Sequence, residues 1–238
     1  DVDAQALSNV IYTSGSTGLP KGVLVRHIGI VRLIRDNQFL ALNGDTVLLQ
    51  CSTMIFDAAT FEIWPVLGNG GQLVLYPDDV IDVEKITDLV NQHQVNTLFL
   101  TVGLFDQLSV IAQPMPSLAW VITGGDVVKP VSVDKLYQAL PDVQVIHAYG
   151  PTENTVFTTC YSVPRPVDLQ RALPLGTAVA GTQCFVLDAN LQLLPVGAIG
   201  ELCLAGDGLS AGYWNKPDET EQKFVKSPFT RQPDARLY

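Results

Sequence analysis

Strand-like apolar runs alternate with helical patterns through the first part of the chain, and this alternation constrains the fold more than any other feature. The apolar runs cover residues 10–12, 73–75, 97–100, 120–122 and 143–146. Between them, apolar residues keep helical spacing at Val83, Ile86, Leu89 and Val90, and again at Leu104, Phe105, Leu108 and Ile111. Since strands that alternate with helices form parallel sheets, we expect an α/β fold with a parallel sheet covered by helices.

The pattern changes after about residue 164, where the helical spacing stops. Short strand-like runs at residues 184–187 and 201–204 stand between glycines and prolines, with no helical pattern between the two runs. Such spacing is typical of a small β-subdomain. We therefore divide the chain into an α/β subdomain, residues 1–168, and a β-rich subdomain, residues 169–238.

Composition limits the classes of function that the chain can have. Its 238 residues are 47% hydrophobic and 16% charged, which is enough apolar surface to bury a core. The formal net charge of −10 argues against a nucleic-acid partner, because such proteins gather lysine and arginine along one face. The apolar runs are shorter than the roughly 20 residues of a membrane span, and no signal-peptide pattern opens the sequence. With four widely spaced cysteines, we expect a cytoplasmic protein with reduced thiols and no membrane partner.

Residues 12–22 read Y-T-S-G-S-T-G-L-P-K-G, a strand followed by a loop of small hydroxyls and glycines that a lysine closes. Glycines let backbone N–H groups converge on an anion, hydroxyls add donors and lysine adds charge, so the loop is a candidate phosphate cradle. A surface turn is the plain alternative. A P-loop is excluded, because Pro20 has no N–H to donate to phosphate and Gly22 has no hydroxyl for magnesium. The candidate contacts are Thr13, Ser14, Gly15, Ser16, Thr17, Gly18 and Lys21.

Two further segments carry polar groups in positions that suggest ligand binding. Tyr149, Thr152 and Glu153 follow the strand at residues 143–146, and open α/β sheets bind ligands at the carboxyl ends of their strands. A purely structural turn is the alternative for this segment. Asp57 lies in an apolar stretch, and a buried carboxylate is costly without a partner, so the partner is expected to be the substrate. A helix-capping role before Ala58 is the alternative for Asp57.

Several motifs stand in one order along the chain: residues 12–22, 56–64 (FDAATFEIW), 124–126 (GGD), 148–153 (AYGPTE), 200–206 (GELCLAG) and 212–214 (GYW). In this order they resemble the motifs of the adenylate-forming superfamily, which includes acyl-coenzyme A synthetases, luciferases and the adenylation domains of nonribosomal peptide synthetases. Asp57 is typical of the amino-acid-activating adenylation domains. The resemblance implies that the last two motifs belong to part of a small distorted β-barrel. It also implies an amino-acid adenylating ligase that uses ATP and magnesium.

The resemblance also assigns roles to residues of the nucleotide site. Lys21 and the loop hydroxyls would hold the leaving pyrophosphate, Thr152 the α-phosphate and Glu153 the magnesium ion, so these three named residues are the candidate catalytic groups. The expected adenine neighbours are Gly125, His147, Ala148 and Tyr149. A satisfied structural histidine is the alternative at position 147.

The resemblance likewise implies a substrate pocket. Its expected lining is Asp57, Ala58, Phe61, Phe99, Ile122, Gly124, Ala148, Val156 and Phe157. Asp57 would bind the α-ammonium group, and the other residues offer no polar side chain, so we expect an aliphatic amino acid such as valine, leucine or isoleucine. The resemblance implies that the aminoacyl group passes to the phosphopantetheine thiol of a carrier-protein domain, with other synthetase domains as further partners.

The sequence departs from the family pattern at its ends. Tyr238 is the last residue, at the first position of a motif that carries the ribose-binding aspartate in the family. We expect the chain to lack the C-terminal lid with its catalytic lysine and an N-terminal segment. The isolated fragment is therefore expected to be inactive, and it could act only as a binding module. An acyl-coenzyme A ligase fragment is a third possibility, which Asp57 disfavours.

Overall fold

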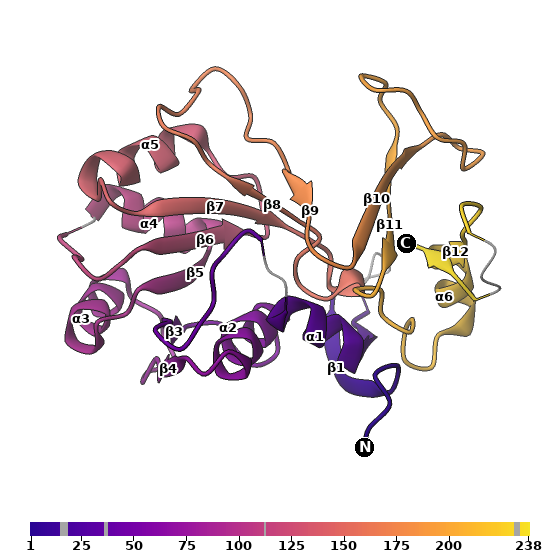
Figure 1. Ribbon diagram of the computed structural model, residues 1–238, viewed down its shortest axis with the longest axis horizontal. Helices are drawn as coiled ribbons and strands as arrows, with labels where there is room; N and C mark the ends of the chain where they lie inside the picture. The colour runs from indigo at the N-terminus through magenta and orange to yellow at the C-terminus, as the bar shows by residue number, and fades with distance from the viewer. Residues whose placement is uncertain (15–18, 36–37, 112, 231–233) are drawn as a thin grey trace.

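A seven-stranded mixed sheet forms the centre of the computed structural model, which describes residues 1–14, 19–35, 38–111, 113–230 and 234–238 (Figure 1). The strand order is β4-β3-β5-β6-β7-β8-β9. The parallel strands are β3 (Val47–Gln50), β4 (Gln72–Leu75), β5 (Thr97–Thr101), β6 (Trp120–Gly124) and β7 (Gln144–Tyr149). At one edge, β8 (Thr159–Ser162) and β9 (Thr177–Ala178) add in antiparallel directions. The expected parallel sheet is confirmed.

Helices cover both faces of the sheet. On one face, α3 (Val83–His93), α4 (Val102–Ile111) and α5 (Pro130–Ala139) pack against Leu98, Val121 and Val145. On the other face, α1 (His27–Ile34) and α2 (Ala58–Gly68) share a cluster with Phe99, Ile122 and Ile146. Burial on both faces explains the continuous apolar runs in the sequence. The helical patterns at residues 83–90 and 104–111 are confirmed as parts of α3 and α4.

Local sequence explains where α3 and α5 begin. Asp82 precedes α3 and its side chain accepts hydrogen bonds from the backbone N–H groups of Glu84 and Lys85, which satisfies donors of the first turn. The helix ends at Gln94, which adopts a left-handed conformation with φ of 54°. Pro130 starts α5, where its missing N–H costs nothing.

The connections that follow β3 and β5 run in opposite directions along the sheet. From β3 the chain runs through α2 to β4 on one side, whereas from β5 it runs through α4 to β6 on the other side. A crevice forms beyond the carboxyl ends of two neighbouring strands whose connections diverge in this way. The fold therefore places its main ligand position between β3 and β5.

The first strand corrects one sequence-based expectation. The run at residues 10–12 does form a strand, β1 (Leu7–Thr13), but β1 lies outside the parallel sheet and pairs antiparallel with β2 (Lys21–Arg26). Parallel neighbours need a crossover of a dozen or more residues, and the connection at residues 14–20 is too short for one. The resulting hairpin places Thr13 opposite Lys21, so both ends of the candidate phosphate loop are held together.

The C-terminal part consists of short strands and one short helix. The runs expected at residues 184–187 and 201–204 are confirmed as parts of β10 (Thr182–Leu187) and β11 (Glu201–Gly206), which pair antiparallel. Helix α6 (Pro217–Lys223) and the pair of β12 (Val225–Lys226) with β13 (Arg236–Leu237) follow. Strand β9 follows residue 168 in the sequence and still belongs to the central sheet. The expected subdomain boundary at residue 168 stays a prediction.

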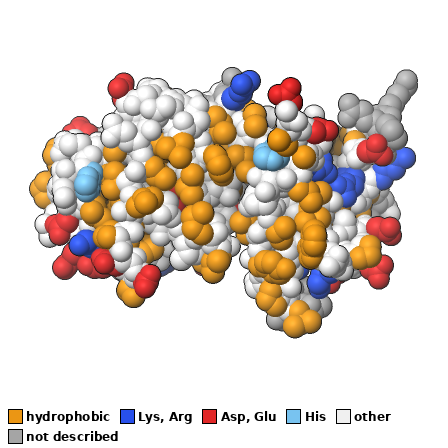
Figure 2. All heavy atoms as spheres, turned by 90° about the horizontal axis from the view of Figure 1, so that it is seen from below, with side chains coloured by type: hydrophobic (Ala, Val, Ile, Leu, Met, Phe, Trp, Pro, Cys, Tyr) orange, Lys and Arg blue, Asp and Glu red, His pale blue; other side chains and the backbone are white. Residues whose placement is uncertain are grey.

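One outer face is notably apolar. Figure 2 shows the molecule from below, the side on which α1 and α2 lie in Figure 1, and hydrophobic side chains are spread over this face. In α2 and the segment before it, the side chains of Met54, Ile55, Phe56, Trp64 and Leu67 are each at least 50% exposed. Within the described residues, no helix combines the length and the hydropathy that crossing a membrane requires. The four cysteines are free thiols, and Cys51, Cys160 and Cys203 are buried.

Candidate functional site

A cavity of about 390 Å³ opens at the divergence point between β3 and β5. Segments at the carboxyl ends of β3, β5 and β6 form most of its wall, together with the start of α2. The lining residues are Cys51, Ser52, Thr53, Phe56, Asp57, Ala58, Ile81, Phe99, Thr101, Leu104, Gly124 and Gly125. Apolar cavities with a few polar groups are typical of small-molecule sites. Asp57 supplies a carboxylate to this wall.

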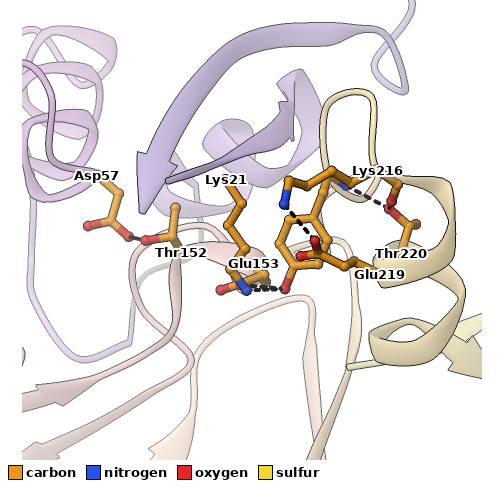
Figure 3. Close-up of polar contacts among 8 residues, drawn as sticks. Lys21, Asp57, Thr152, Glu153, Lys216, Glu219 and Thr220 are labelled. Atoms are coloured by element: carbon orange, nitrogen blue, oxygen red, sulfur yellow. Dashed lines mark hydrogen bonds and ion pairs between the residues drawn. The ribbon is translucent and has the colours of Figure 1, made fainter. Parts of the chain in front are cut away.

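The side chain of Asp57 faces Thr152 and does not cap α2. Asp57 precedes the helix in a helical conformation and makes no side-chain capping bond. Its Oδ2 accepts a hydrogen bond of 2.7 Å from the Thr152 hydroxyl (Figure 3). Burial raises the pKa of Asp57, and the hydrogen bond from Thr152 offsets part of that rise. No salt bridge reaches Asp57 within the described part of the chain, so this carboxylate is available to a cationic ligand group.

A second polar centre joins three elements that are far apart in sequence. Lys21 Nζ at the start of β2 lies 3.1 Å from Glu153 Oε1, in the short helix η1 (Thr152–Asn154). Lys21 Nζ also donates to the Tyr213 hydroxyl at 2.7 Å, and that hydroxyl donates to Glu153 Oε1 at 2.6 Å. Burial opposes the ionisation of Glu153, but the Tyr213 and Lys21 contacts prevail and lower its pKa. The centre therefore holds a carboxylate beside an ammonium group.

The two polar centres meet at η1. Thr152 contacts Asp57 on the cavity side, and the next residue, Glu153, contacts Lys21 and Tyr213 (Figure 3). A ligand that occupies the cavity and reaches Thr152 would therefore also lie beside Lys21. This arrangement suits a molecule with an apolar cationic part and an anionic part.

The candidate phosphate loop is only partly described. Thr13 ends β1 and Ser14 follows it as an exposed residue, whereas Gly15, Ser16, Thr17 and Gly18 lie outside the described residues. The Thr13 hydroxyl is buried and has no hydrogen-bond partner among the residues that the structure describes. A buried hydroxyl in that position is suited to donate to a ligand.

The expected pocket residues fall into two layers. Asp57, Ala58, Phe99 and Gly124 line the cavity. The other expected residues lie behind them in the buried core, and these are Phe61, Ile122, Ala148, Val156 and Phe157.

Close packing joins the two layers. The ring centroids of Phe61 and Phe157 are 4.6 Å apart, and those of Phe99 and Phe157 are 5.9 Å apart. At Gly124, a Cβ atom would lie 2.0 Å from the Ala148 carbonyl oxygen, so only glycine fits. The inner layer therefore fixes the position of the cavity wall.

The expected adenine neighbours surround the ends of β6 and β7. Gly125 lines the cavity with a positive φ of 88°, and Tyr149 ends β7 with its side chain half-buried. His147 is buried, and its Nδ1 donates to the Pro174 carbonyl oxygen at 2.9 Å. Burial lowers the pKa of His147, which keeps the ring neutral. This geometry is that of a satisfied structural histidine, and its contact with adenine stays a prediction.

Sequence reasoning missed several residues of the site. The sequence shows Tyr213 only as part of a motif, although its hydroxyl links Lys21 to Glu153. Ser52 and Thr53 line the cavity because they follow β3, a strand that was not among those expected from the sequence. The signal for them was available, since polar residues directly after an apolar run mark a strand's carboxyl end.

Comparison with known proteins is consistent with this geometry. The family model described as "AMP-binding enzyme" matches residues 1–214. A linear gramicidin synthase protein of Brevibacillus parabrevis is 46% identical over 100% of this chain, which spans 3% of that relative's length. Tyrocidine synthase 3 of the same organism is 41% identical over 99% of this chain and 4% of its own length.

A solved structure shows the same similarity. An NRPS protein that contains adenylation and PCP domains, solved with a vinylsulfonamide inhibitor, superposes with a TM-score of 0.92 at 34% identity, over 100% of this chain and 41% of that one. The chain therefore belongs to the family of AMP-binding enzymes, with adenylation domains of nonribosomal peptide synthetases among its homologues.

Proposed function

We propose that the protein activates an amino acid with ATP to give an aminoacyl adenylate and pyrophosphate. The hydrogen bond between Thr152 and Asp57 carries this proposal, because it joins the apolar cavity to the centre formed by Lys21 and Glu153. The α-ammonium group of an amino acid would pair with Asp57. Its carboxylate would then lie toward Thr152 and the phosphates of ATP.

In the proposed reaction, a carboxylate oxygen of the amino acid attacks the α-phosphorus of ATP. A new bond forms between this oxygen and the α-phosphorus, and the bond to the bridging oxygen of the β-phosphate breaks, so that pyrophosphate leaves with the electron pair. No proton transfer is required of the protein, so positioning and charge stabilisation supply most of the catalysis. Lys21 would neutralise the leaving pyrophosphate, and the Thr152 hydroxyl would orient the α-phosphate.

The side chains at η1 fit a magnesium ion bound together with nucleotide phosphates. Magnesium usually takes one or two protein carboxylates plus phosphate oxygens, and Glu153 provides one buried carboxylate next to the phosphate-loop lysine. No group of three or more potential metal ligands occurs within the described residues, which is consistent with a site that the nucleotide completes. When bound, magnesium supplies positive charge that stabilises the phosphates.

The proposed substrate is an aliphatic amino acid such as valine, leucine or isoleucine. Phe99 and Gly124 line the cavity and the rings of Phe61 and Phe157 stand behind it, so a polar side chain packed against these residues would lose its hydration without gaining a partner, although the cavity wall also carries the hydroxyls of Ser52, Thr53 and Thr101. An unsatisfied buried polar group costs about 1–3 kcal/mol. One methylene is worth a similar amount, so we expect incomplete discrimination among the aliphatic amino acids.

The proposed product would be transferred to the phosphopantetheine thiol of a carrier-protein domain. A structural relative at 34% identity contains adenylation and PCP domains in one protein, which supports this partner. An acyl-coenzyme A ligase is the second candidate, and the carboxylate of Asp57 in the cavity wall, which has no salt bridge within the described residues, speaks against it. A module that binds ligands without turnover is the third.

Binding of stable adenylate analogues tests the proposal on the chain as it stands. We expect valyl sulfamoyl-adenosine to bind more tightly than its 3-methylbutanoyl counterpart, which lacks the amino group, and more tightly than glutaminyl sulfamoyl-adenosine. In Asp57→Asn the valyl ligand should lose about 10- to 100-fold in affinity while the 3-methylbutanoyl ligand changes little, since only the former loses a charged hydrogen bond. Asp134→Asn, at a half-buried position on α5 that does not line the cavity, is the matched control.

Calorimetry measures these affinities. Equal losses for both ligands in Asp57→Asn would contradict a role for Asp57 in amino-group recognition. Amino-acid-dependent exchange of labelled pyrophosphate into ATP then separates an enzyme from a module that only binds. We expect the isolated chain to show far less exchange than the same chain joined to a C-terminal lid subdomain.

A further inference from the structure

The segment between the two polar centres and the pocket has a strained backbone. Thr155 and Val156 both adopt positive φ angles, 48° and 66°, and Val156 is β-branched. Such conformations are energetically unfavourable and persist only where the surroundings hold them. Glu153 lies just before this pair and Phe157 just after it, so the strained backbone sets the positions of both.

Arg32 of α1 holds this segment from behind. Its Nη2 donates to the carbonyl oxygens of Asn154, Thr155 and Phe157, with distances of 2.9 Å to Thr155 and 2.7 Å to Phe157. Its Nη1 donates to the Thr182 hydroxyl at 2.8 Å. One guanidinium group therefore fixes the carbonyl groups on both sides of Val156.

The guanidinium group of Arg32 is a buried cation without a salt bridge among the described residues. Arg32 is only 5% exposed. Burial lowers its pKa to about 10, which leaves the group protonated at neutral pH. An arginine buried in this way needs hydrogen-bond acceptors, and the backbone carbonyls of the strained segment supply them.

The turn at Gly208 leaves room for the Arg32 guanidinium group. At Gly208, a Cβ atom would lie 2.5 Å from Arg32 Nη2 and 2.5 Å from Asn154 Oδ1, so any larger residue would displace the guanidinium group. The Thr155 hydroxyl donates to the Gly208 carbonyl oxygen at 2.8 Å and ties the same two segments together. Arg32 is thus enclosed by α1, the strained segment and the turn at Gly208.

We propose that Arg32 is a positioning residue for both halves of the site: by holding residues 154–157 it keeps Glu153 against Lys21 and Phe157 behind the substrate pocket. The choice of ligand in this inference rests on the proposed function. The claim that Arg32 holds residues 154–157 does not depend on it. Loss of Arg32 lowers ligand affinity and side-chain selectivity together, because both depend on one backbone segment. Arg32 touches neither substrate nor nucleotide in this role.

Arg32→Lys is the principal test, because lysine keeps the charge but lacks the planar fork that reaches acceptors on several sides. Affinity for valyl sulfamoyl-adenosine should fall about 10- to 100-fold, the range seen for residues that support a site from behind. The preference for the valyl over the glutaminyl ligand should shrink toward unity. NMR signals of the Val156 methyl groups should shift in the free protein. Arg236→Lys is the matched control, since Arg236 donates to the Ala211 carbonyl and does not touch residues 154–157.

A merely structural role predicts a different result. If Arg32→Lys lowers the melting temperature but leaves affinity, selectivity and the Val156 signals of the folded protein unchanged, the proposal is wrong. Thr182→Val serves if Arg32→Lys does not fold, because it removes only the acceptor of Nη1. It should give smaller changes in the same direction, and wild-type behaviour in all three readouts would overturn the proposal. If the wild-type chain binds no aminoacyl ligand, the proposed function fails, while the Val156 signals still decide the role of Arg32.

Discussion

The two faces of strands β5, β6 and β7 are equally buried but differ in what they do. We call the side with Leu98, Val121 and Val145 the scaffold face, and the side with Phe99, Ile122 and Ile146 the site face. Successive residues of a strand point to opposite faces, so neighbours in sequence belong to different environments. The scaffold face packs against α3, α4 and α5, whereas the site face carries the aromatic cluster and leads to the cavity through Phe99.

The backbone conformation also differs between the segments that pack on the two faces. The helices of the scaffold face include α3 with a regular N-cap at Asp82 and a left-handed end at Gln94. Beside the site face, Thr155 and Val156 are strained, and the Asn154 side-chain oxygen is buried without a partner among the described residues. Strain and unsatisfied polar groups gather at functional sites, because regular packing alone would not produce them. Burial therefore does not distinguish the two faces, whereas the strained pair Thr155 and Val156 lies beside the site face.

The largest expected effect is a loss of folding stability without a loss of ligand affinity, from a substitution in α4. Phe105 is fully buried on the scaffold face, and Phe105→Ala should lower the free energy of unfolding by about 3–5 kcal/mol through the cavity it leaves. The protein that remains folded should bind valyl sulfamoyl-adenosine as the wild type does. Urea denaturation and calorimetry at low temperature measure the two quantities.

The preceding residue supplies the matched variant. Leu104 lines the cavity between β3 and β5, so Leu104→Ala should cost less stability and change ligand affinity more than Phe105→Ala does. If the two variants have the same pair of effects, contact with the cavity does not separate binding from stability within α4.

Glu62 gives the next largest effect, and it depends on pH. Its carboxylate in α2 is fully buried and accepts hydrogen bonds from the backbone N–H groups of Cys51 and Ser52. Burial raises its pKa from 4.5 to about 7. Between these two values the folded protein keeps a proton that the unfolded chain has lost, so the stability from this group falls as pH rises and levels off above about 7.

We expect this fall to reach about 3 kcal/mol at most in the wild type. Glu62→Gln cannot ionise and keeps a carbonyl acceptor, so its free energy of unfolding should decline less between pH 5 and pH 7.5. Glu84→Gln, at an exposed position in α3, should keep the wild-type slope. A Glu62→Gln slope equal to that of the wild type would show that Glu62 does not titrate in this window.

Local sequence patterns were sufficient for the parts of the fold that depend on local periodicity. Helix α3 was recognisable because its apolar spacing follows the helical period, and the strands at residues 97–100 and 120–122 were recognisable as short continuous apolar runs. The partner of β1 was not, since pairing depends on the length of the connection to β2 rather than on the strand itself. Strand β3 was not expected, although its apolar run at residues 47–49 is as long as the recognised run at residues 73–75.

The site was predictable where a motif carried it and not where a distant contact completed it. Lys21, Asp57 and Glu153 were named from sequence, and the structure brings Lys21 to Glu153 and Asp57 to Thr152. Their roles toward a ligand stay predictions. The Tyr213 hydroxyl lies 192 positions from Lys21 in sequence, beyond the reach of any local pattern. Arg32 gave no signal either, because arginine is ordinarily an exposed residue.

A smaller effect compares two neighbouring residues of β5. Phe99 faces the cavity, so Phe99→Leu should enlarge it and shift the preference between valyl and larger aminoacyl ligands by about 10- to 100-fold toward the larger ones. Leu98 points to the scaffold face, and Leu98→Val should cost about 1 kcal/mol of stability without changing that preference. Competition binding with a panel of aminoacyl sulfamoyl-adenosines measures the shift. A change of preference in Leu98→Val would mean that the scaffold face also shapes the pocket.

The smallest expected effect comes from an ion pair at α6, which packs on neither face of strands β5, β6 and β7. Lys216 Nζ contacts Glu219 Oε1 at 2.5 Å in the first turn of α6, and both side chains are partly exposed, at 28% and 38% (Figure 3). Such surface pairs contribute about 0.2–1 kcal/mol at most, and salt screens them. Glu219→Gln should therefore lower the free energy of unfolding only slightly, and by less still at high salt.

The helix does touch the site indirectly, because the Tyr213 backbone N–H donates to the Thr220 hydroxyl at 3.0 Å. That bond depends on Thr220 and the Lys216 carbonyl oxygen, not on the Lys216 ammonium group, so ligand affinity should stay at the wild-type value. Thr220→Val is the informative partner variant: it removes this bond and should weaken ligand binding while the ion pair remains. Reduced affinity in Glu219→Gln would instead make α6 part of the site, and the functional boundary would then extend beyond the sheet.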